Sequence, residues 1–349
     1  MAAEDMILVI DEGASSTRAI VFDQAFIPVA QAQTEVGLSY PDDGWVEQDG
    51  AEIWDKTLQV CRDAIAAAGG VERIAAIGIT NQRETTLVWD RQTGTPIAPA
   101  IIWQDRRTAS VCASLVEAGH EPAVQNATGL LIDPYFSGTK IGWLLDHVDG
   151  AREKAEAGAL AFGTVDSFLI WNLTACEVHA TDLSNASRTL LYPLSLSEDY
   201  NWSAEMLDLL GIPDGLLPRV LPSGAPFGMT DPTLFGRSIP ILSAIGDQQA
   251  ALVGQSCLAP GTAKITYGTG AFLVANTGQD VPRSENRLLG TLGYGNQDGS
   301  SAFALEGAIF NAGTVIQWLR DEMGLIADAP SSEAKAAALA EYGGVYLVP

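Results

Sequence analysis

The sequence predicts an α/β protein made of two similar domains with a cleft between them. Apolar strand patterns alternate with helical patterns along the chain, which favours mixed α/β architecture. Two strand–turn–strand segments rich in Gly, Ser and Thr stand far apart, at 6–23 and 263–275. Glycine lets a turn approach a ligand closely, and successive N–H groups of a turn hold anions. The two turns therefore indicate a duplicated fold that holds a polyphosphate from both sides.

The remaining elements follow from hydrophobic periodicity and from glycine and proline breaks. Strands are expected at 74–79, 86–90, 101–103 and 239–245, and the chain stops in a strand-like segment at 345–349. Helices are expected at 51–68, from 106, from 250, at 308–323 and at 331–341, and residues 140–215 are expected to be mainly helical. A domain boundary is expected at 260–261, so that the chain divides into domains at 6–254 and 262–349.

Composition limits the function classes. The 349 residues carry a formal charge of −24, from 43 acidic and 19 basic side chains. Such a surface argues against binding nucleic acid or anionic membranes through bulk charge. Four cysteines without paired spacing favour reduced thiols, and we find neither a signal-peptide pattern nor a membrane-spanning apolar run. These features predict a cytoplasmic protein that is not inserted in a membrane.

Polar or aromatic side chains follow several of the predicted strands at their carboxyl ends: Asp11, Arg83, Glu84, Trp103 and Asp247. Ligands of open α/β sheets bind outside those ends, so the sequence predicts one convergent site. Neither a P-loop nor a G-x-G-x-x-G dinucleotide motif is present. Taken singly, each of these residues could equally be a turn residue, a cap or part of a surface ion pair.

Several segments together resemble the glycerol kinases, a group of the FGGY carbohydrate kinases in the actin-like ATPase superfamily. The segments are DEGASSTR at 11–18, TNQRETT at 80–86, DPYFSGTK at 133–140, GDQQAA at 246–251, YGTG at 267–270 and LEGA at 305–308. The resemblance implies two ribonuclease-H-like domains, of which the second is incomplete because the chain stops before the family's remaining segments. It also implies ATP-dependent phosphorylation of glycerol to sn-glycerol 3-phosphate.

The resemblance assigns the substrate side of the site. Asp247 would be the general base on the glycerol hydroxyl that is phosphorylated. The residues that would hydrogen-bond glycerol are Arg83, Glu84, Tyr135, Asp247 and Gln248. Trp103 and Phe272 would pack on its carbon backbone. This residue set suits glycerol, because a small triol needs a polar partner for each hydroxyl.

On the nucleotide side, the resemblance implies ATP phosphates held by two turns. The residues implied are Gly13, Ala14, Ser15, Ser16, Thr17, Arg18, Thr269, Gly313 and Gln317. Asp11 would act on Mg²⁺ through water. Ala14 stands where the family usually has Thr, so one hydroxyl contact to phosphate is expected to be missing.

The expected partners are glycerol and ATP, with a homo-oligomer in the full-length form. Two alternatives stay open at this point. One is another FGGY sugar kinase, although the N-Q-R-E and G-D-Q-Q segments weigh against it. The other is a truncated, non-catalytic glycerol-binding sensor.

Overall fold

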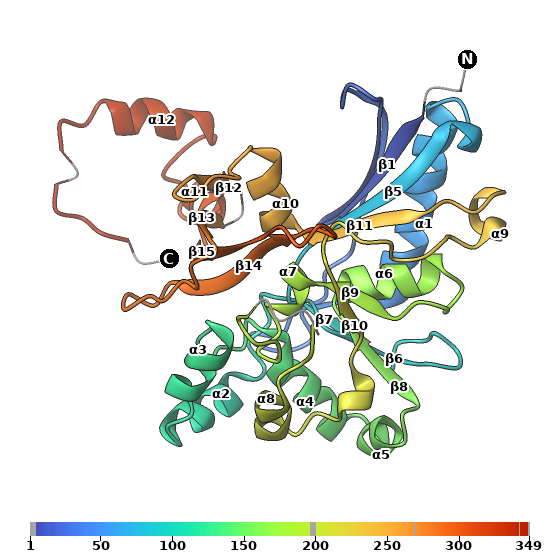
Figure 1. The fold of residues 1–349 in the computed structure, drawn as a ribbon. Coiled ribbons are helices and arrows are strands. Elements are labelled where there is room, and N and C mark those ends of the chain that lie inside the picture. The colour runs from blue at the N-terminus through green and yellow to red at the C-terminus, as the bar shows by residue number, and fades with distance from the viewer. Residues whose placement is uncertain (1–4, 196–199, 269, 342, 348–349) are drawn as a thin grey trace.

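The larger of the two main sheets, called the first sheet below, is mixed and has five strands (Figure 1). Its strands, in spatial order, are β11 (Ile241–Gly246), β5 (Ile74–Asn81), β1 (Met6–Glu12), β2 (Ser16–Phe22) and β3 (Pro28–Glu35). β11, β5 and β1 are parallel, whereas β1, β2 and β3 are joined by antiparallel pairing. The computed structural model describes residues 5–195, 200–268, 270–341 and 343–347.

The second sheet is antiparallel and has four strands, in the order β12 (Ala263–Tyr267), β13 (Ala271–Gly278), β15 (Ser301–Ile309) and β14 (Leu289–Gly295). Three small two-stranded sheets complete the strands. They are β4 (Glu47–Gln48) with β7 (Ala100–Ile101), β6 (Leu87–Asp90) with β8 (Leu160–Gly163), and β9 (Ala180–Asp182) with β10 (Arg219–Leu221).

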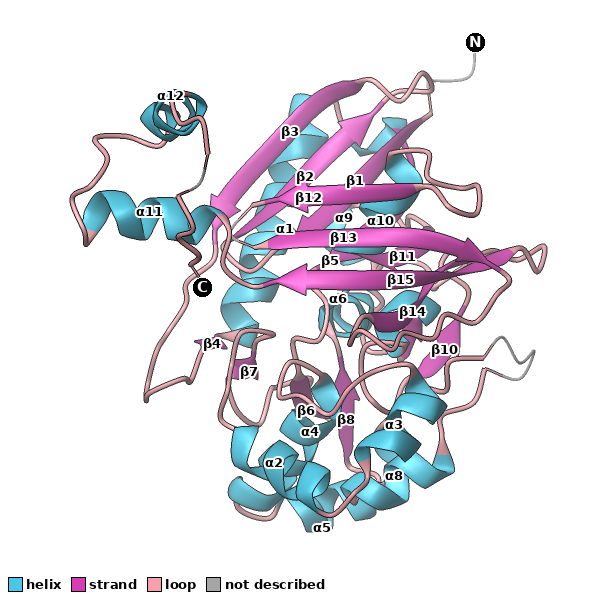
Figure 2. Ribbon diagram, turned by 90° about the vertical axis from the view of Figure 1, so that its left-hand side faces the viewer, coloured by secondary structure: helices cyan, strands magenta, loops and turns pink. Residues whose placement is uncertain are grey.

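Helices cover the sheets and form a lower layer. α1 (Gly50–Ala67) begins at the cap Asp49, whose side chain accepts a hydrogen bond from the amide of Ala51 at 2.8 Å. It buries Ile53, Val60 and Cys61 in the same core as the first sheet. In Figures 1 and 2, the helices α2 (Ala109–Glu117), α3 (Glu121–Thr128), α4 (Ser137–His147), α5 (Ala151–Glu156) and α8 (Ala204–Leu210) gather below the sheets.

The other helices lie close to the sheets or beyond them. They are α6 (Val165–Leu173), α7 (Leu183–Ala186), α9 (Pro232–Phe235), α10 (Asp247–Gly254), α11 (Gly313–Asp321) and α12 (Pro330–Ala337), with 3₁₀ turns at Val71–Arg73 and Asp214–Leu216. Figures 1 and 2 both show α12 away from the body of the molecule. Within the described residues, no helix is long and apolar enough to cross a membrane.

Both predicted hairpins are present, as β1–β2 and β12–β13. The predicted helix at 51–68 and the predicted strand at 74–79 are also present, within one or two residues. The segment 140–215 is less helical than expected, because β8 and β9 lie inside it. Short apolar runs fit a buried strand and a buried helix equally well, so periodicity could not separate them.

Three further expectations were wrong in detail. The helix expected at 308–323 spans only Gly313–Asp321, because β15 continues to Ile309. The helix expected from 250 begins at Asp247, directly after β11. Residues 345–347 form no strand; 348–349 lie outside the described residues.

The second sheet contacts the helical layer at Gly129, where α3 ends. Gly129 has a φ of +74°, and its carbonyl accepts a hydrogen bond from the amide of Gly290 on β14 at 2.8 Å. A Cβ at position 129 would lie 2.5 Å from Cδ2 of Leu194 and 3.0 Å from the carbonyl oxygen of Gly290. The contact therefore requires glycine for both its conformation and its size.

We predict that Gly129→Ala lowers the free energy of unfolding by about 2–4 kcal/mol, through backbone strain and overpacking together. The matched control is Gly150→Ala, since Gly150 also has positive φ, +71°, but nothing lies within 4 Å of an added Cβ. The control should lose only the strain contribution, about 1 kcal/mol. Urea unfolding of both variants measures the difference, and equal losses would contradict the role given to the contact with Gly290.

Candidate active site

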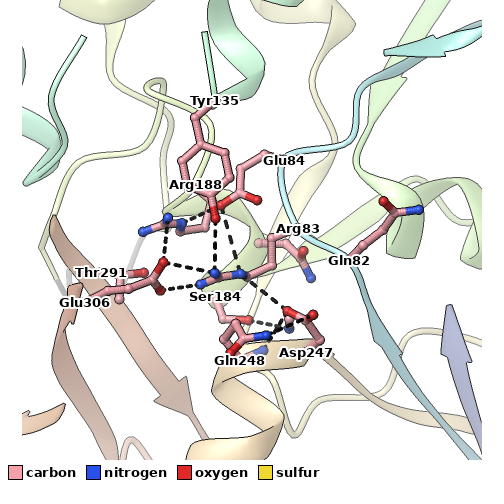
Figure 3. Close-up of polar contacts among 12 residues, drawn as sticks. Gln82, Arg83, Glu84, Tyr135, Ser184, Arg188, Asp247, Gln248, Thr291 and Glu306 are labelled. Carbon is pink, nitrogen blue, oxygen red and sulfur yellow. Dashed lines mark hydrogen bonds and ion pairs between the residues drawn. The ribbon is translucent and has the colours of Figure 1, made fainter. Parts of the chain in front are cut away.

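Three adjacent parallel strands bring charged side chains to one edge of the first sheet. Asp11 lies near the end of β1, Arg83 and Glu84 follow β5, and Asp247 follows β11. Trp103 follows β7, which pairs with β4 outside this sheet, so its position does not come from the same sheet edge. Glu306 arrives from β15 of the second sheet and completes the cluster shown in Figure 3.

Arg83 is the centre of the cluster. Its guanidinium is buried and binds both oxygens of the Glu306 carboxylate, with Nη1–Oε2 and Nη2–Oε1 distances of 2.5 and 3.0 Å. Nη1 also donates to Oε1 of Gln249 at 3.2 Å, and Nη2 donates to the Tyr135 hydroxyl at 3.4 Å. Nε lies 3.5 Å from Oδ1 of Asp247. The planar donor fork of arginine thus fixes groups from both sheets at once.

Arg188 is a second buried arginine behind Arg83. Its Nε donates to Oε1 of Glu84 at 2.7 Å, and Nη2 donates to Oε1 of Glu306 at 3.0 Å. The guanidinium also lies over the rings of Tyr135 and Phe136, 5.4 and 5.1 Å from their centroids. Two arginines therefore offset the charges of Glu84 and Glu306, which would be prohibitively costly to bury alone.

Glu84 is held in a strained backbone conformation, with a φ of +61°. Its carbonyl accepts hydrogen bonds from Oγ of Ser137 at 3.0 Å, Oγ1 of Thr86 at 3.0 Å and Nζ of Lys140 at 3.5 Å. A non-glycine residue keeps such a conformation only when its surroundings impose it. The donors from α4 and the Arg188 contact supply that constraint.

Burial and the arginines set the protonation of these carboxyl groups. Burial opposes ionisation of Glu306, but Arg188 and Arg83 outweigh it and lower its pKa to about 2. Burial raises the pKa of Glu84, against the opposing effect of Arg83 and Arg188. Burial likewise raises the pKa of Asp247, and Arg83 opposes this rise. Asp247 is thus a carboxylate with an increased affinity for a proton, and its side chain remains 38% exposed.

Asp247 is held by the start of α10. The amide of Gly246 donates to Oγ of Ser184 at 2.8 Å, and that hydroxyl donates to Asp182 at 2.9 Å. The side-chain and backbone nitrogens of Gln248 donate to the two oxygens of Asp247, at 3.2 and 2.7 Å. Asp247 therefore has one fixed orientation beside a partly open space.

A group of aromatic rings adjoins the cluster at Tyr135. Trp103 packs edge-on against Tyr135 and Phe272, with centroid distances of 6.0 and 5.9 Å, and a tilted Phe310 ring lies 6.1 Å away. Trp103, Tyr135 and Phe310 line a cavity of about 550 Å³. Arg106 and Asp133 also line this cavity, and Tyr135 connects it to the cluster through its hydrogen bond with Arg83.

In the turn of the first hairpin, hydrogen bonds from the protein occupy the backbone carbonyl oxygens. The carbonyl oxygens of Gly13, Ala14, Ser15 and Ser16 all accept hydrogen bonds from the protein, at 3.3, 2.9, 3.0 and 3.0 Å. Arg18 reaches back to Asp11, with 3.7 Å between Nη1 and Oδ2. Thr17 is buried against Thr57 and does not face the solvent. With its carbonyls occupied, the turn is suited to receive an anion.

The turn of the second hairpin contacts the start of α11. The amide of Gly313 donates to the carbonyl of Gly268 at 2.9 Å, so Gly313 lies next to this turn. Gln317 is exposed one helical turn further on. Thr269 lies outside the described residues.

Several residues of the cluster were missed by reasoning from the sequence. Arg188 received no role, although it is the one charge in the stretch 183–194. Glu306 lies in the segment LEGA and Lys264 in the second predicted hairpin, but neither was assigned a role in the site. The sequence gives no signal for Lys264, because alternation along β12 would bury the apolar Ile265, whereas the structure buries Lys264 and leaves Ile265 exposed.

A buried carboxyl beneath the site makes stability depend on pH. Asp166 accepts hydrogen bonds from the hydroxyls of Thr164 and Thr181, at 2.5 and 2.7 Å, close to Asp182. Burial raises the pKa of Asp166 from 3.8 to about 6, and the charge of Asp182 adds to the rise. The folded state therefore holds a proton that the unfolded state has lost between these values. The contribution of this proton to the stability of the fold is complete below pH 3.8 and is lost as the pH rises through about 6.

We predict that Asp166→Asn, which carries no titrating group, gains stability relative to the unaltered chain as pH rises. The gain between pH 4 and pH 7.5 should be about 3 kcal/mol, because each pKa unit corresponds to about 1.4 kcal/mol. Urea unfolding at the two pH values measures it, with Asp55→Asn on the exposed side of α1 as control. The same difference at both pH values would show that Asp166 does not titrate differently in the folded state.

Two family models match the chain. The N-terminal domain model of the FGGY family of carbohydrate kinases matches residues 6–254, and the C-terminal domain model of that family matches residues 263–349.

Curated relatives agree with this match. The chain is 57% identical over 344 residues to a glycerol kinase of Ectopseudomonas mendocina, covering 98% of this chain and 69% of the relative. It is 55% identical over 350 residues to a glycerol kinase of Rhodospirillum centenum, covering 100% and 70%. The chain thus spans about two thirds of the length of the relatives it matches.

Solved structures share the fold. The glycerol kinase of Plasmodium falciparum with ADP superimposes with a TM-score of 0.88 at 33% identity, over 95% of this chain and 66% of that one. A xylulose kinase from Lactobacillus acidophilus gives a TM-score of 0.79 at 20% identity, over 91% and 62%, which indicates the fold alone. The resemblance stated from the sequence and the predicted actin-like α/β fold are both confirmed: the chain belongs to the FGGY family of carbohydrate kinases.

Proposed function

We propose that this chain carries the glycerol site and both phosphate-binding turns of an ATP-dependent glycerol kinase that makes sn-glycerol 3-phosphate. The observation that carries the proposal is the position of Asp247. Its carboxylate lies beside the buried cluster of Arg83 and Glu306, at the same sheet edge as the first turn. The relatives at 55–57% identity are glycerol kinases, which supports glycerol as the acceptor.

In this proposal glycerol lies between the charged cluster and the aromatic rings. Arg83, Glu84, Tyr135, Asp247 and Gln248 pair its hydroxyls, and Trp103 and Phe272 contact its carbons. An analogue that lacks a hydroxyl leaves one of these buried polar groups without a partner, which is the physical basis of specificity. Arg188 and Glu306 do not need to touch glycerol, since they hold Arg83 and Glu84 in place.

The transfer step needs alignment and one proton acceptor. A terminal hydroxyl oxygen of glycerol forms a bond to the γ-phosphorus of ATP, and the bond from that phosphorus to the bridging oxygen breaks to release ADP. The hydroxyl proton passes to Asp247. The burial that raises the pKa of this carboxyl favours its acceptance of a proton, while Arg83 keeps it ionised beforehand.

The two hairpin turns are proposed to hold the nucleotide phosphates. Residues 13–18, with Ala14 and the buried Thr17 contributing backbone only, form one side. Thr269 of the second turn, with Gly313 and Gln317 on α11, belongs to the other. The hydrogen bond from Gly313 to Gly268 supports this grouping.

Mg²⁺ is proposed to act at Asp11. Burial raises the pKa of Asp11, Arg18 opposes this, and the negative charge of Asp247 adds to the rise. Asp11 would hold the cation through water, and the cation would neutralise phosphate charge there. The described residues offer no group of three or more His, Cys, Asp or Glu that would hold a metal, so phosphate oxygens and water would supply the other ligands.

We further propose that residues 6–254 and 262–349 are the two domains of this kinase, that the full-length form is a cytoplasmic homo-oligomer, and that the cleft between the domains closes on the substrates. An alternative is a glycerol-binding protein without turnover.

We predict that the chain binds glycerol and that Asp247→Asn lowers glycerol-dependent ADP release by about 10²-fold or more, as removal of a general base does. Glycerol affinity should change less than turnover. A coupled ADP assay with and without glycerol, followed by mass analysis of the product, makes the measurement, and D-xylulose and gluconate serve as competing acceptors.

Three outcomes separate the possibilities. Turnover in Asp247→Asn close to that of the unaltered chain would remove the residue from the base role. Glycerol binding without any turnover would favour the sensor. Turnover with a sugar but not with glycerol would assign another acceptor within the family.

A further inference from the structure

Lys264 is a buried lysine that the proposed mechanism does not use. Burial alternates along β12, but the buried side chain is the charged one: Lys264 is only 5% exposed, whereas the neighbouring Ile265 is 50% exposed. Burying an ammonium is costly unless acceptors replace its water. Its partners should therefore explain why the inward position is a lysine.

The ammonium of Lys264 has three acceptors, one for each proton. Nζ donates to Oγ1 of Thr266 at 2.9 Å and to the carbonyl of Phe272 at 3.4 Å, both on the same hairpin. Its third partner is Oε1 of Gln248, on α10. This last hydrogen bond joins the second sheet to the residue next to Asp247.

The chemistry of the two partners fixes the Gln248 amide. An ammonium can only donate, so the amide must turn its oxygen toward Lys264. The amide nitrogen then faces Asp247 and donates to Oδ2 at 3.2 Å. If the amide were reversed, two oxygens would face each other at the carboxylate and the nitrogen would face the ammonium.

We propose that Lys264 is a positioning residue of the phosphoryl transfer: its ammonium sets the orientation of the Gln248 amide, and Gln248 in turn orients the Asp247 carboxylate. The inference rests on the proposed function only where it treats Asp247 as the base. Because Lys264 lies on the hairpin of the second turn, the part of this orientation that comes from the Gln248 side chain depends on the docking of the two sheets. The same contact thereby couples assembly of the phosphate side to the readiness of the base.

The charged groups around Lys264 are compatible with an ammonium at neutral pH. Burial lowers the pKa of Lys264 to about 8 and Arg83 adds to the decrease, whereas Glu306, Asp247 and Cys257 oppose it. The group therefore stays mainly protonated at pH 7 and can donate all three hydrogen bonds.

The test is the pKa of Asp247 in the chain without ligand, followed by ¹³C NMR of aspartate carboxyl carbons and assigned with Asp247→Asn. We expect Lys264→Met to raise this pKa by roughly one unit, because the ionised form loses the hydrogen bond from Gln248. Gln248→Met should raise it by a similar amount. Lys264→Met added to Gln248→Met should then raise the pKa by less than it does in the unaltered chain, because only the direct charge interaction remains, and Lys264→Arg should keep most of the original value.

Equal pKa increases from Lys264→Met with and without Gln248 would overturn the proposal, since Lys264 would then act through its charge alone. An unchanged pKa in Gln248→Met would also overturn it, and this variant tests the idea even if Lys264→Met does not fold. Lys154→Met, at an exposed position of α5, is the control for loss of a lysine elsewhere.

Glycerol affinity, measured by calorimetry, is the second readout. Lys264→Met should weaken binding about 10-fold, the effect of one misplaced hydrogen-bond partner, and Lys264→Arg should restore it. If the unaltered chain does not bind glycerol, the proposed function fails, while the pKa cycle still decides whether Lys264 orients Asp247.

Discussion

The contact on which the site depends is the carboxylate of Glu306 between Arg83 and Arg188. All three side chains are buried, and the carboxylate comes from the second sheet whereas both arginines come from residues 6–254. Removing one member of such a buried set leaves an unpaired charge, which costs about 3–5 kcal/mol. The same ion pairs thus fix the position of the second sheet and balance the buried charges of the site.

The cluster also supports the proposal that the site binds a neutral polar molecule. Each side-chain nitrogen of Arg83 contacts a protein group, and Nε of Arg188 binds Glu84, so the carboxylates Glu84 and Asp247 are held with a fixed geometry. Preorganised polar groups lose little entropy on binding and leave hydroxyls as their best partners. The strained backbone of Glu84, whose carbonyl accepts three hydrogen bonds, is part of this arrangement.

The sequence predicted the parts of this site that lie in local patterns. The two hairpins, the strand before Arg83 and the strand before Asp247 follow from alternation and turn glycines. Placing Asp11, Arg83 and Asp247 together needed only the rule for carboxyl ends of parallel strands. Arg188 and Glu306 could not be found in this way, because their partners are more than 100 residues away in the chain. The break between β15 and α11 was missed for a related reason, since strand pairing with β13, rather than local propensity, keeps Ala308 and Ile309 extended.

Comparative calorimetry of glycerol, propane-1,2-diol and propane-1,3-diol binding to this chain tests the central claim most directly. If the buried cluster pairs each hydroxyl, glycerol binds and each diol binds about 10-fold or more weakly, because a missing hydroxyl leaves a buried group unpaired. Glycerol and both diols binding with equal affinity, or glycerol not binding at all, would contradict the account of the site given by Arg83, Glu84 and Asp247.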